Sequence, residues 1–131
     1  MKFPSQAWAD ALRSVVNADT EYADAARGWE GDILLRVTGG TAEAPTPGVH
    51  LDLTNGRCRG ARFLADSRST ESEFVFEGSA ESWQRVLARQ IDPVQAIMGG
   101  TLKVRGNMAK LLRFTRAARQ LVHDVGSIPV E

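Results

Sequence analysis

The sequence has few of the residues that support disulfides, metal sites or catalysis. Among its 131 residues are one cysteine, Cys58, and two histidines, His50 and His123. A single cysteine cannot form an internal disulfide. One cysteine with two distant histidines also falls short of the three or four clustered ligands that zinc requires. The sequence therefore predicts neither a disulfide scaffold nor a metal site.

Long apolar runs are also absent. The chain contains no stretch of about eighteen apolar residues and no charged segment followed by an apolar one, which would mark a membrane span or a secretory leader. Together with the lone cysteine, these absences lead us to expect a protein of the reducing cytoplasm. Residues 1–131 are expected to form a single domain with room for one core and one modest cavity.

Candidate catalytic groups lack the neighbours that a reaction would need. His50 is predicted in the middle of a strand and His123 near the end of the last helix. Neither belongs to a motif that pairs histidine with a serine or cysteine nucleophile. The glycine pairs at 39–40 and 99–100 lack the surrounding pattern of a phosphate-binding loop. We therefore expect no enzymatic activity and no cofactor.

The charges balance, but they are unevenly distributed. Sixteen basic and sixteen acidic residues leave no net charge, which argues against nucleic acid as a partner. Residues 93–123 contain no acidic side chain, whereas basic ones recur there. Lys110, Arg113 and Arg116 are candidates for contact with an acidic lipid headgroup, a CoA phosphate or an anionic membrane, each worth roughly 1 kcal/mol at such a surface. The alternative is a solvated helix face that pairs with the acidic N-terminal half.

Two helices are predicted at the start of the chain. Ser5 is expected to cap an amphipathic helix, because the residues that follow it in the sequence are apolar at helical spacing. Thr20 is expected to cap a second helix from Glu21 to about Arg27, which Gly28 ends.

Three strands are predicted to follow. Residues 33–37 form an apolar, β-branched run of strand length. Residues 49–53 and 57–64 flank Asn55-Gly56, a dipeptide typical of a tight hairpin. We therefore expect these last two strands to pair antiparallel.

The second half of the chain is predicted to contain a strand, two helices, a strand and a long closing helix, at residues 73–77, 82–90, 93–98, 101–105 and 108 to beyond 122. Ser79 and Asn107 are expected to cap the first and the last of these helices. The apolar stripe of the closing helix is wide enough to pack on a sheet or to line a cavity.

This order of elements predicts an α+β fold. Strands are grouped in the middle of the chain and helices lie at both ends, which favours an antiparallel sheet with helices packed on one face. The strand at 101–105 is separated from the others by two helices, so it must join the sheet through a crossover.

Residues 92–108 read Asp-Pro-Val-Gln-Ala-Ile-Met-Gly-Gly-Thr-Leu-Lys-Val-Arg-Gly-Asn-Met. This stretch resembles the C-terminal signature of the sterol carrier protein 2 (SCP-2) family, in which an Asp-Pro helix leads into a Gly-x-Leu-x-Val-x-Gly-Asp strand. Trp29, Gly31 and Trp83, with the spacing of the elements, extend the resemblance over most of the chain. Asn107 stands where the family usually has aspartate.

The resemblance implies a five-stranded, mostly antiparallel sheet with helices on one face and a C-terminal helix that closes a hydrophobic pocket. It also implies non-enzymatic binding, and transfer, of a fatty acid, a fatty acyl-CoA or a sterol-like lipid. The side chains expected to contact lipid are Phe74, Phe76, Trp83, Leu87, Ile97, Met98, Leu102, Met108, Leu111, Leu112 and Phe114.

A different class of function stays open. The same fold can serve as a ligand-free interaction or dimerisation module, with Met108, Leu112 and Phe114 buried against protein. The sequence favours no particular oligomeric state.

Overall fold

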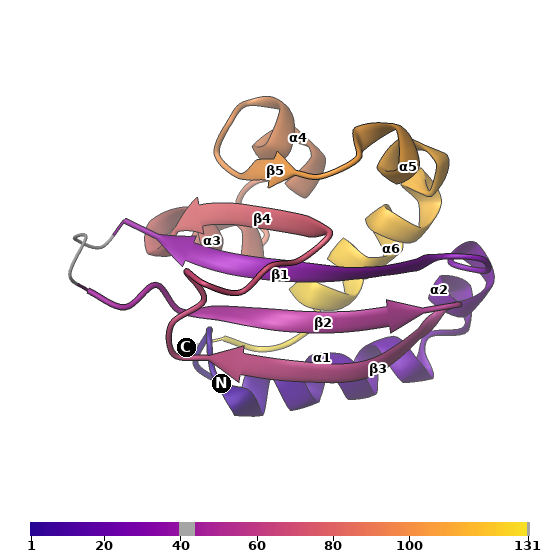
Figure 1. Ribbon diagram of the computed structural model, residues 1–131, viewed down its shortest axis with the longest axis horizontal. Helices are drawn as coiled ribbons and strands as arrows, with labels where there is room; N and C mark the ends of the chain where they lie inside the picture. Colours follow the sequence, from indigo (N-terminus) through magenta and orange to yellow (C-terminus); the bar gives the residue numbers. More distant parts are fainter. Residues whose placement is uncertain (40–43, 131) are drawn as a thin grey trace.

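The computed structural model describes residues 1–39 and 44–130 (Figure 1). In this part of the chain the helices are α1 (Gln6–Ala18), α2 (Thr20–Ala25), α3 (Ala80–Leu87), α4 (Pro93–Met98), α5 (Met108–Arg113) and α6 (Thr115–Gly126). The strands are β1 (Glu30–Thr38), β2 (Gly48–Thr54), β3 (Arg57–Leu64), β4 (Phe74–Ser79) and β5 (Lys103–Arg105).

The strands of the described residues form one sheet in the order β3-β2-β1-β4-β5. Neighbouring strands are antiparallel except for β1 and β4, which run parallel. The hairpin of β2 and β3 turns at Asn55 and Gly56, which both have positive φ, as the sequence predicts. The predicted α+β class, with a mostly antiparallel five-stranded sheet and a crossover into β5, is confirmed.

β1 and β4 become parallel neighbours because the chain crosses the sheet after β3. Figure 1 shows this connection passing in front of the sheet, on the side away from the helices. Ser67 in the connection is fully buried, and the guanidinium of Arg36 on β1 donates to its backbone oxygen at 3.0 Å. The Ser67 hydroxyl in turn donates to the carbonyl of Thr46 at 2.8 Å. These bonds hold the connection against the sheet while it returns the chain beside β1.

The core lies between the sheet and the helices behind it. Side chains alternate along a strand, so Ile33, Leu35 and Val37 of β1 share one face, and all three are buried. α1 covers the β3 end of that face with its fully buried residues Trp8 and Leu12, while α6 packs against α1 and α2. Full burial of such a side chain is worth about 1.5–3 kcal/mol, so this layer supplies much of the folding free energy.

The closing helix is interrupted, which corrects our prediction of one continuous helix. Phe114 leaves the helical conformation with φ −114° and ψ 34°, and it separates α5 from α6. Its ring packs edge-on against Trp29, with 5.1 Å between the ring centroids, and the Thr115 hydroxyl donates to the Leu112 carbonyl at 2.6 Å. The prediction failed because helix propensity along this stretch contains no break signal, and a tertiary contact decides the break.

Other boundaries differ by up to three residues: β1 begins three residues before the predicted strand, and α3 ends three residues before the predicted helix. α2 is capped by Asp19, whose carboxylate accepts from the backbone N–H groups of Glu21 and Tyr22, and Thr20 is its first helical residue. Ser79 caps α3 and Asn107 caps α5, as expected. The predicted loop before β2 falls partly on residues 40–43, which lie outside the described residues.

Gly106, at the start of the turn into α5, offers a test of backbone constraint. Its φ is +138°, and a β-carbon there would meet the Phe74 ring and would lie 2.7 Å from the Glu73 carbonyl oxygen. Gly100 has φ +80° and nothing within 4 Å of the same position. We expect Gly100→Ala to cost about 1–2 kcal/mol from backbone strain alone, and Gly106→Ala to cost roughly twice as much or more. Urea unfolding measures both, and equal losses would contradict the crowding at Gly106.

Candidate functional site

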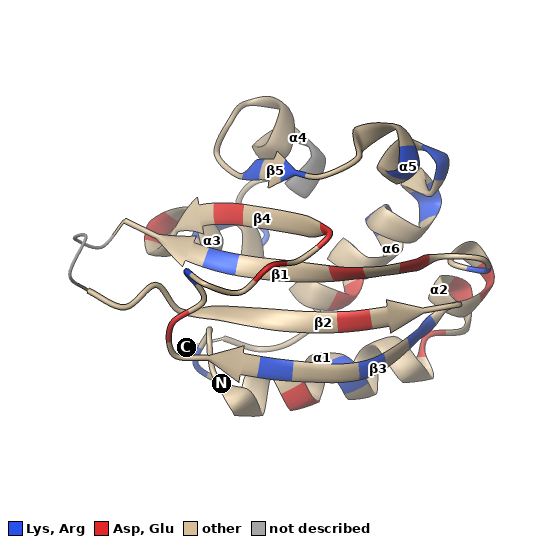
Figure 2. Ribbon diagram, in the orientation of Figure 1, with Lys and Arg blue, Asp and Glu red and all other residues tan. Residues whose placement is uncertain are grey.

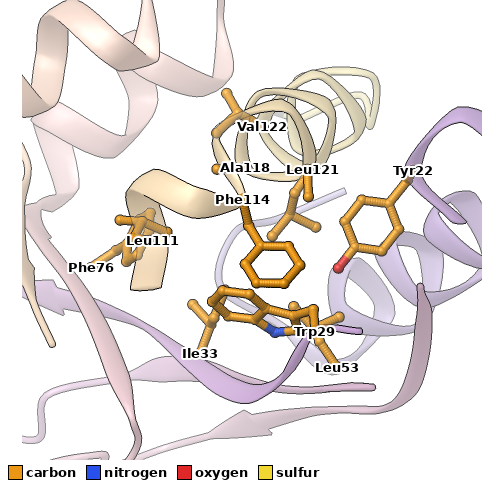
Figure 3. A pocket seen from close by; sticks show the side chains of 11 residues that line it. Tyr22, Trp29, Ile33, Leu53, Phe76, Leu111, Phe114, Ala118, Leu121 and Val122 are labelled. Carbon is orange, nitrogen blue, oxygen red and sulfur yellow. The ribbon is translucent and has the colours of Figure 1, made fainter. Parts of the chain in front are cut away.

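A pocket lies between the helix-covered face of the sheet and the C-terminal helices (Figure 3). Its lining comes from α2, the start of β1 and the residue before it, the end of β2, the middle of β4, α5, the helix break and α6: Tyr22, Trp29, Ile33, Leu53, Phe76, Leu111, Phe114, Ala117, Ala118, Leu121 and Val122. Apart from the Tyr22 hydroxyl and the Trp29 indole nitrogen, these side chains are hydrocarbon. The wall of the pocket is therefore suited to an apolar ligand.

The pocket is narrow in this conformation. It encloses about 370 Å³ between the side chains, including space open to solvent, but the centre of a water molecule fits in only about 30 Å³ of it. By this measure a single water needs roughly 10–15 Å³, so the space suits two or three waters and not a long alkyl chain. A lipid can enter only if part of the lining moves.

Trp29 forms the base of the pocket. Its ring lies 5.4 Å from the ring of Phe74 and 5.1 Å from that of Phe114, measured between centroids. The indole N–H donates to the Gly31 carbonyl at 3.1 Å, which satisfies the polar atom of an otherwise buried ring. Figure 3 shows the Phe114 ring directed at Trp29 from the helix break above it. The residue that interrupts the closing helix is therefore part of the pocket wall.

Lys110 lies over the edge of this aromatic group. Its ammonium is 4.9 Å from the Trp29 ring centroid, 2.7 Å from Glu73 Oε1, and it also donates to the Glu30 carbonyl. The Lys110 side chain is only 21% exposed, so it is anchored beside the pocket and does not project from the surface. Lys110 therefore does not belong to a fully solvated helix face, and its contact with an acidic headgroup stays a prediction.

The two arginines predicted with Lys110 are placed differently from each other. Arg116 forms an ion pair with Asp24 of α2 at 3.0 Å, which supports the alternative of pairing with the acidic N-terminal half. Both side chains are more than half exposed, so the pair contributes little to stability. Arg113 is exposed at the end of α5.

The predicted lipid contacts fall into three groups. Phe76, Leu111 and Phe114 line the pocket. Phe74, Trp83, Leu87 and Leu102 are buried in the core, and Ile97 is partly buried against it. Met98, Met108 and Leu112 are exposed, with 83%, 43% and 69% of their surface accessible, so the structure does not bring them to the pocket. The sequence reasoning assigned the whole apolar stripe of the closing helix to the pocket, whereas Leu111 is the residue of α5 that lines it. Met98 lies on α4, outside that helix.

Several lining residues were missed by the sequence reasoning: Tyr22, Trp29, Ile33, Leu53, Ala117, Ala118, Leu121 and Val122. On α6 the helical spacing of Ala118, Leu121 and Val122 was a usable signal, because it places them on the face that continues from Phe114. The small side chains of Ala117 and Ala118 leave space opposite Trp29 that larger residues would fill. No local signal identified Tyr22 or Leu53, which reach the pocket only through the packing of α2 and β2.

A pair of carboxyl groups, of which Asp124 is buried and Asp19 is partly exposed, lies next to the pocket. Asp124 of α6 is 4% exposed, and burial together with the neighbouring Asp19 raises its pKa to about 8. Burial acts in the same direction on Asp19, but hydrogen bonds from Asp124, from Gln120 at 2.8 Å and from the start of α2 lower its pKa below the ordinary value. The pair therefore holds one proton near neutral pH. Burial and the charge of Asp124 also raise the pKa of Tyr22, so this lining hydroxyl stays protonated.

The histidines considered as catalytic candidates, His50 and His123, are not among the residues that line the pocket. In the described residues, no three histidine, cysteine or acidic side chains are grouped to hold a metal ion. His50 Nε2 lies 2.7 Å from Asp32 Oδ2, and neither residue lines the pocket. Across residues 1–39 and 44–130, no helix is both long and apolar enough to cross a bilayer. The pocket offers shape and apolar surface for binding.

Comparison with known proteins identifies a family. The model of the SCP-2 sterol transfer family matches residues 10–119. A crystal structure of sterol carrier protein 2 is 34% identical, with a TM-score of 0.84 over 94% of this chain and 96% of that one. The solution structure of a conserved hypothetical protein from Thermus thermophilus, described as possibly a sterol carrier protein, is 32% identical, with a TM-score of 0.84 over 100% of this chain and 92% of that one. No curated protein sequence matches the chain.

A more distant structure, a sterol carrier protein domain of Helicoverpa armigera, is similar in fold. It is 20% identical, with a TM-score of 0.61 over 95% of this chain and 91% of that one. The SCP-2-like architecture expected from the sequence is thereby confirmed.

The carboxyl pair predicts how stability changes with pH. The folded chain keeps a proton on Asp124 up to about pH 8, whereas the unfolded chain releases it near the ordinary value of 3.8. The stability that this proton contributes is complete below the unfolded pKa and is lost as the pH rises through the folded pKa. The pKa of Asp19 is lowered on folding, so its contribution to stability is lost as the pH falls, mainly below pH 4. It therefore does not hide the change that Asp124 causes at higher pH.

We therefore expect Asp124→Asn to remove a pH dependence of up to about 1.4 kcal/mol per pH unit between about pH 5 and 8. Urea unfolding of both proteins at several pH values measures the difference, which should grow in favour of the variant as the pH rises. Parallel curves would show that Asp124 does not hold its proton in the folded state.

Proposed function

Because the chain belongs to the SCP-2 sterol transfer family, we propose that its pocket binds the apolar part of a lipid and carries the lipid without reacting with it. The observation that carries this proposal is the lining: side chains from every layer of the fold converge on one space with almost no polar surface. The absence of a nucleophile, base or metal ligand among these residues is consistent with binding alone.

The energetics of such a ligand are favourable. Burying a chain of about sixteen carbons, at about 0.8 kcal/mol per CH2, gives a gross gain on the order of 12 kcal/mol. Association costs remove several kcal/mol of this, which leaves affinity in the micromolar range or better. The candidates are a fatty acid, a fatty acyl-CoA or a sterol-like lipid, all of which offer an apolar body of this size.

α5 is the element best placed to open the pocket. None of its residues is buried, and it is bounded by Gly106 on one side and by the helix break at Phe114 on the other. Leu111 is its one contribution to the lining. Displacing α5 therefore exposes little core surface, and it widens the space between Phe76 and α6 into which an alkyl chain would pass.

Lys110 gives the opening a preference for an acidic headgroup. Its ammonium is held beside Trp29 and pairs with Glu73, whose side chain is 38% exposed. A ligand carboxylate or phosphate at the rim would compete with Glu73 for this ammonium. Charge-assisted hydrogen bonds of this kind are roughly twice as strong as neutral ones.

A ligand-free dimerisation module is the second candidate, and the exposed side chains of Met108 and Leu112 are the observation that favours it. Phe114, which was expected to join them at a protein interface, faces Trp29 inside its own chain. The narrow pocket is compatible with either function.

Native mass spectrometry of freshly purified protein tests the proposal directly. Lipid binding predicts a co-purified adduct, or saturable binding of a fluorescent fatty acid that unlabelled fatty acid displaces. If the purified protein carries no lipid and also fails to bind the fluorescent fatty acid, the lipid-carrier function is excluded, and the ligand-free dimerisation module becomes the better candidate.

Leu111 and Leu112 form a matched pair for locating the ligand. Leu111→Trp should fill the pocket and weaken fatty-acid binding tenfold or more, at a stability cost of about 1–3 kcal/mol from overpacking. Leu112→Trp, the same change one residue later on the exposed face, should leave both affinity and stability within about 0.5 kcal/mol of the parent. Titration with fluorescent fatty acid and urea unfolding give the two readouts. Equal losses of affinity in both variants would refute this pocket.

Lys110→Met tests the headgroup preference. The variant keeps an unbranched apolar side chain of nearly the same length beside Trp29, but it removes the ammonium and its charge. We expect affinity for a fatty acid to fall about tenfold, equivalent to about 1.4 kcal/mol, while affinity for the matching fatty alcohol stays the same. Competition against the same fluorescent probe measures both. If acid and alcohol weaken equally, Lys110 supports the fold of the rim and not the headgroup.

A further inference from the structure

Exposed large apolar side chains are concentrated on one part of the molecule. In the described residues they are Met1, Met98, Met108 and Leu112. Met98 is the last residue of α4, and Met108 and Leu112 belong to α5. β5, the edge strand of the sheet, lies between these helices in the chain, and Figure 1 shows all three elements along the same edge of the molecule. We call this the α4–β5–α5 edge.

The charges of the α4–β5–α5 edge all have one sign. Figure 2 shows basic segments on β5 and α5 and no acidic segment between α4 and α5. Lys103 and Arg113 are exposed. Arg105 pairs with Glu77 of β4 at 2.8 Å, yet its side chain stays 72% exposed. The exposed apolar side chains of this edge therefore belong to a segment whose charged residues are all basic, and Lys103 and Arg113 of that segment are exposed.

We propose that the α4–β5–α5 edge docks on the surface of an anionic lipid bilayer. Met98, Met108 and Leu112 would enter the boundary between headgroups and acyl chains, while Lys103 and Arg113 contact the acidic headgroups. This combination of long apolar side chains and flanking Lys or Arg is what holds a peripheral protein at an interface, because apolar burial and attraction to anionic lipid add together.

The composition of the edge favours a lipid surface over a protein partner. Protein interfaces concentrate their binding energy in buried Trp, Tyr and Arg at the centre of a packed patch. None of the exposed large apolar side chains of the described residues is aromatic. Unbranched methionines adapt to a fluid surface as readily as to a fixed one.

Docking would place the moving part of the pocket at the bilayer. Leu111 lines the pocket and Leu112 is exposed on the same helix, so α5 presents one residue to the ligand space and the next to the membrane. That docking would assist the exchange of lipid between the pocket and the bilayer rests on the proposed function. The docking itself depends only on the exposed residues and can be measured in a chain with an empty pocket.

The experiment is cosedimentation of the full chain with vesicles of phosphatidylcholine alone and of phosphatidylcholine with phosphatidylserine at roughly two to one. The apolar variant carries Met98→Gln and Leu112→Gln, and the charge variant carries Lys103→Gln and Arg113→Gln. A control carries Arg59→Gln and Arg62→Gln, which remove the same charge from exposed positions on β3, the opposite edge of the sheet. Thermal unfolding verifies that all of them are folded.

We expect the parent to bind the anionic vesicles and to bind phosphatidylcholine weakly. The charge variant should lose about fivefold in affinity per residue, and its binding should depend less on salt. The apolar variant should lose about tenfold or more on the same vesicles, because each side chain forfeits burial in the interface. The control should bind within about twofold of the parent, since its charges face away from the bilayer.

Three results would overturn the proposal. The first is a parent that shows no preference for anionic vesicles at low salt. The second is an apolar variant or a charge variant that binds as the parent does. The third is a parent dimer in analytical ultracentrifugation that the apolar variant abolishes without vesicle binding in either protein, which would assign the edge to a second copy of the chain.

Fatty-acid titration without vesicles separates this proposal from the proposed function. If the apolar variant binds fatty acid as the parent does but no longer binds vesicles, the edge is a docking surface and the pocket is independent of it. If the parent binds vesicles through this edge but takes up no fatty acid, docking stands and the lipid-carrier function fails.

Discussion

The contact between Phe114 and Trp29 is the constraint on which the pocket depends. Trp29 is fixed by Phe74 and by the hydrogen bond of its indole nitrogen to Gly31. Phe114 can reach this ring only by leaving the helical conformation, and it thereby divides the closing helix into α5 and α6. The break costs helical hydrogen bonds, but it gives the chain a short, separately placed helix over the mouth of the pocket.

Around this contact, the structure contains features that lower the free energy of unfolding and that a fully packed domain would lack. Ala117 and Ala118 leave unfilled space in a region where close packing would add stability. Asp124 is buried beside Asp19 and must hold a proton to stay there, close to the lining residue Tyr22. Cavities and buried carboxyl groups reduce stability, so their position next to one apolar space is what a binding site leads one to expect. The rest of the core, from Trp8 to Phe74, is densely buried and carries the fold.

The sequence was sufficient for the architecture and insufficient for the pocket, for a physical reason. The Asn55-Gly56 hairpin, the Ser79 and Asn107 caps and the apolar run of β1 are local signals, and the structure contains each of them. The break at Phe114 accompanies a contact with Trp29, which lies far earlier in the sequence. Which of the neighbouring residues Leu111 and Leu112 faces the pocket depends on how α5 is set against the sheet, and no local signal gives that. In the same way, the sequence alone does not distinguish Lys110 from the other basic residues of this segment. Its contacts with Glu73 and Trp29 set it apart, and they depend on the tertiary structure.

The two faces of α5 have different surroundings. Met108, Leu111 and Leu112 all lie within this one short helix, so the break at Phe114 does not change their positions relative to one another. What the break changes is the direction of α5 relative to α6, because the chain leaves the helical conformation between them. In the resulting arrangement Leu111 lines the pocket, while Leu112 and Met108 stay exposed. Exposing side chains of this size costs hydrophobic free energy unless another surface covers them, so the helix that completes the pocket wall also carries an unfavourable exposed surface.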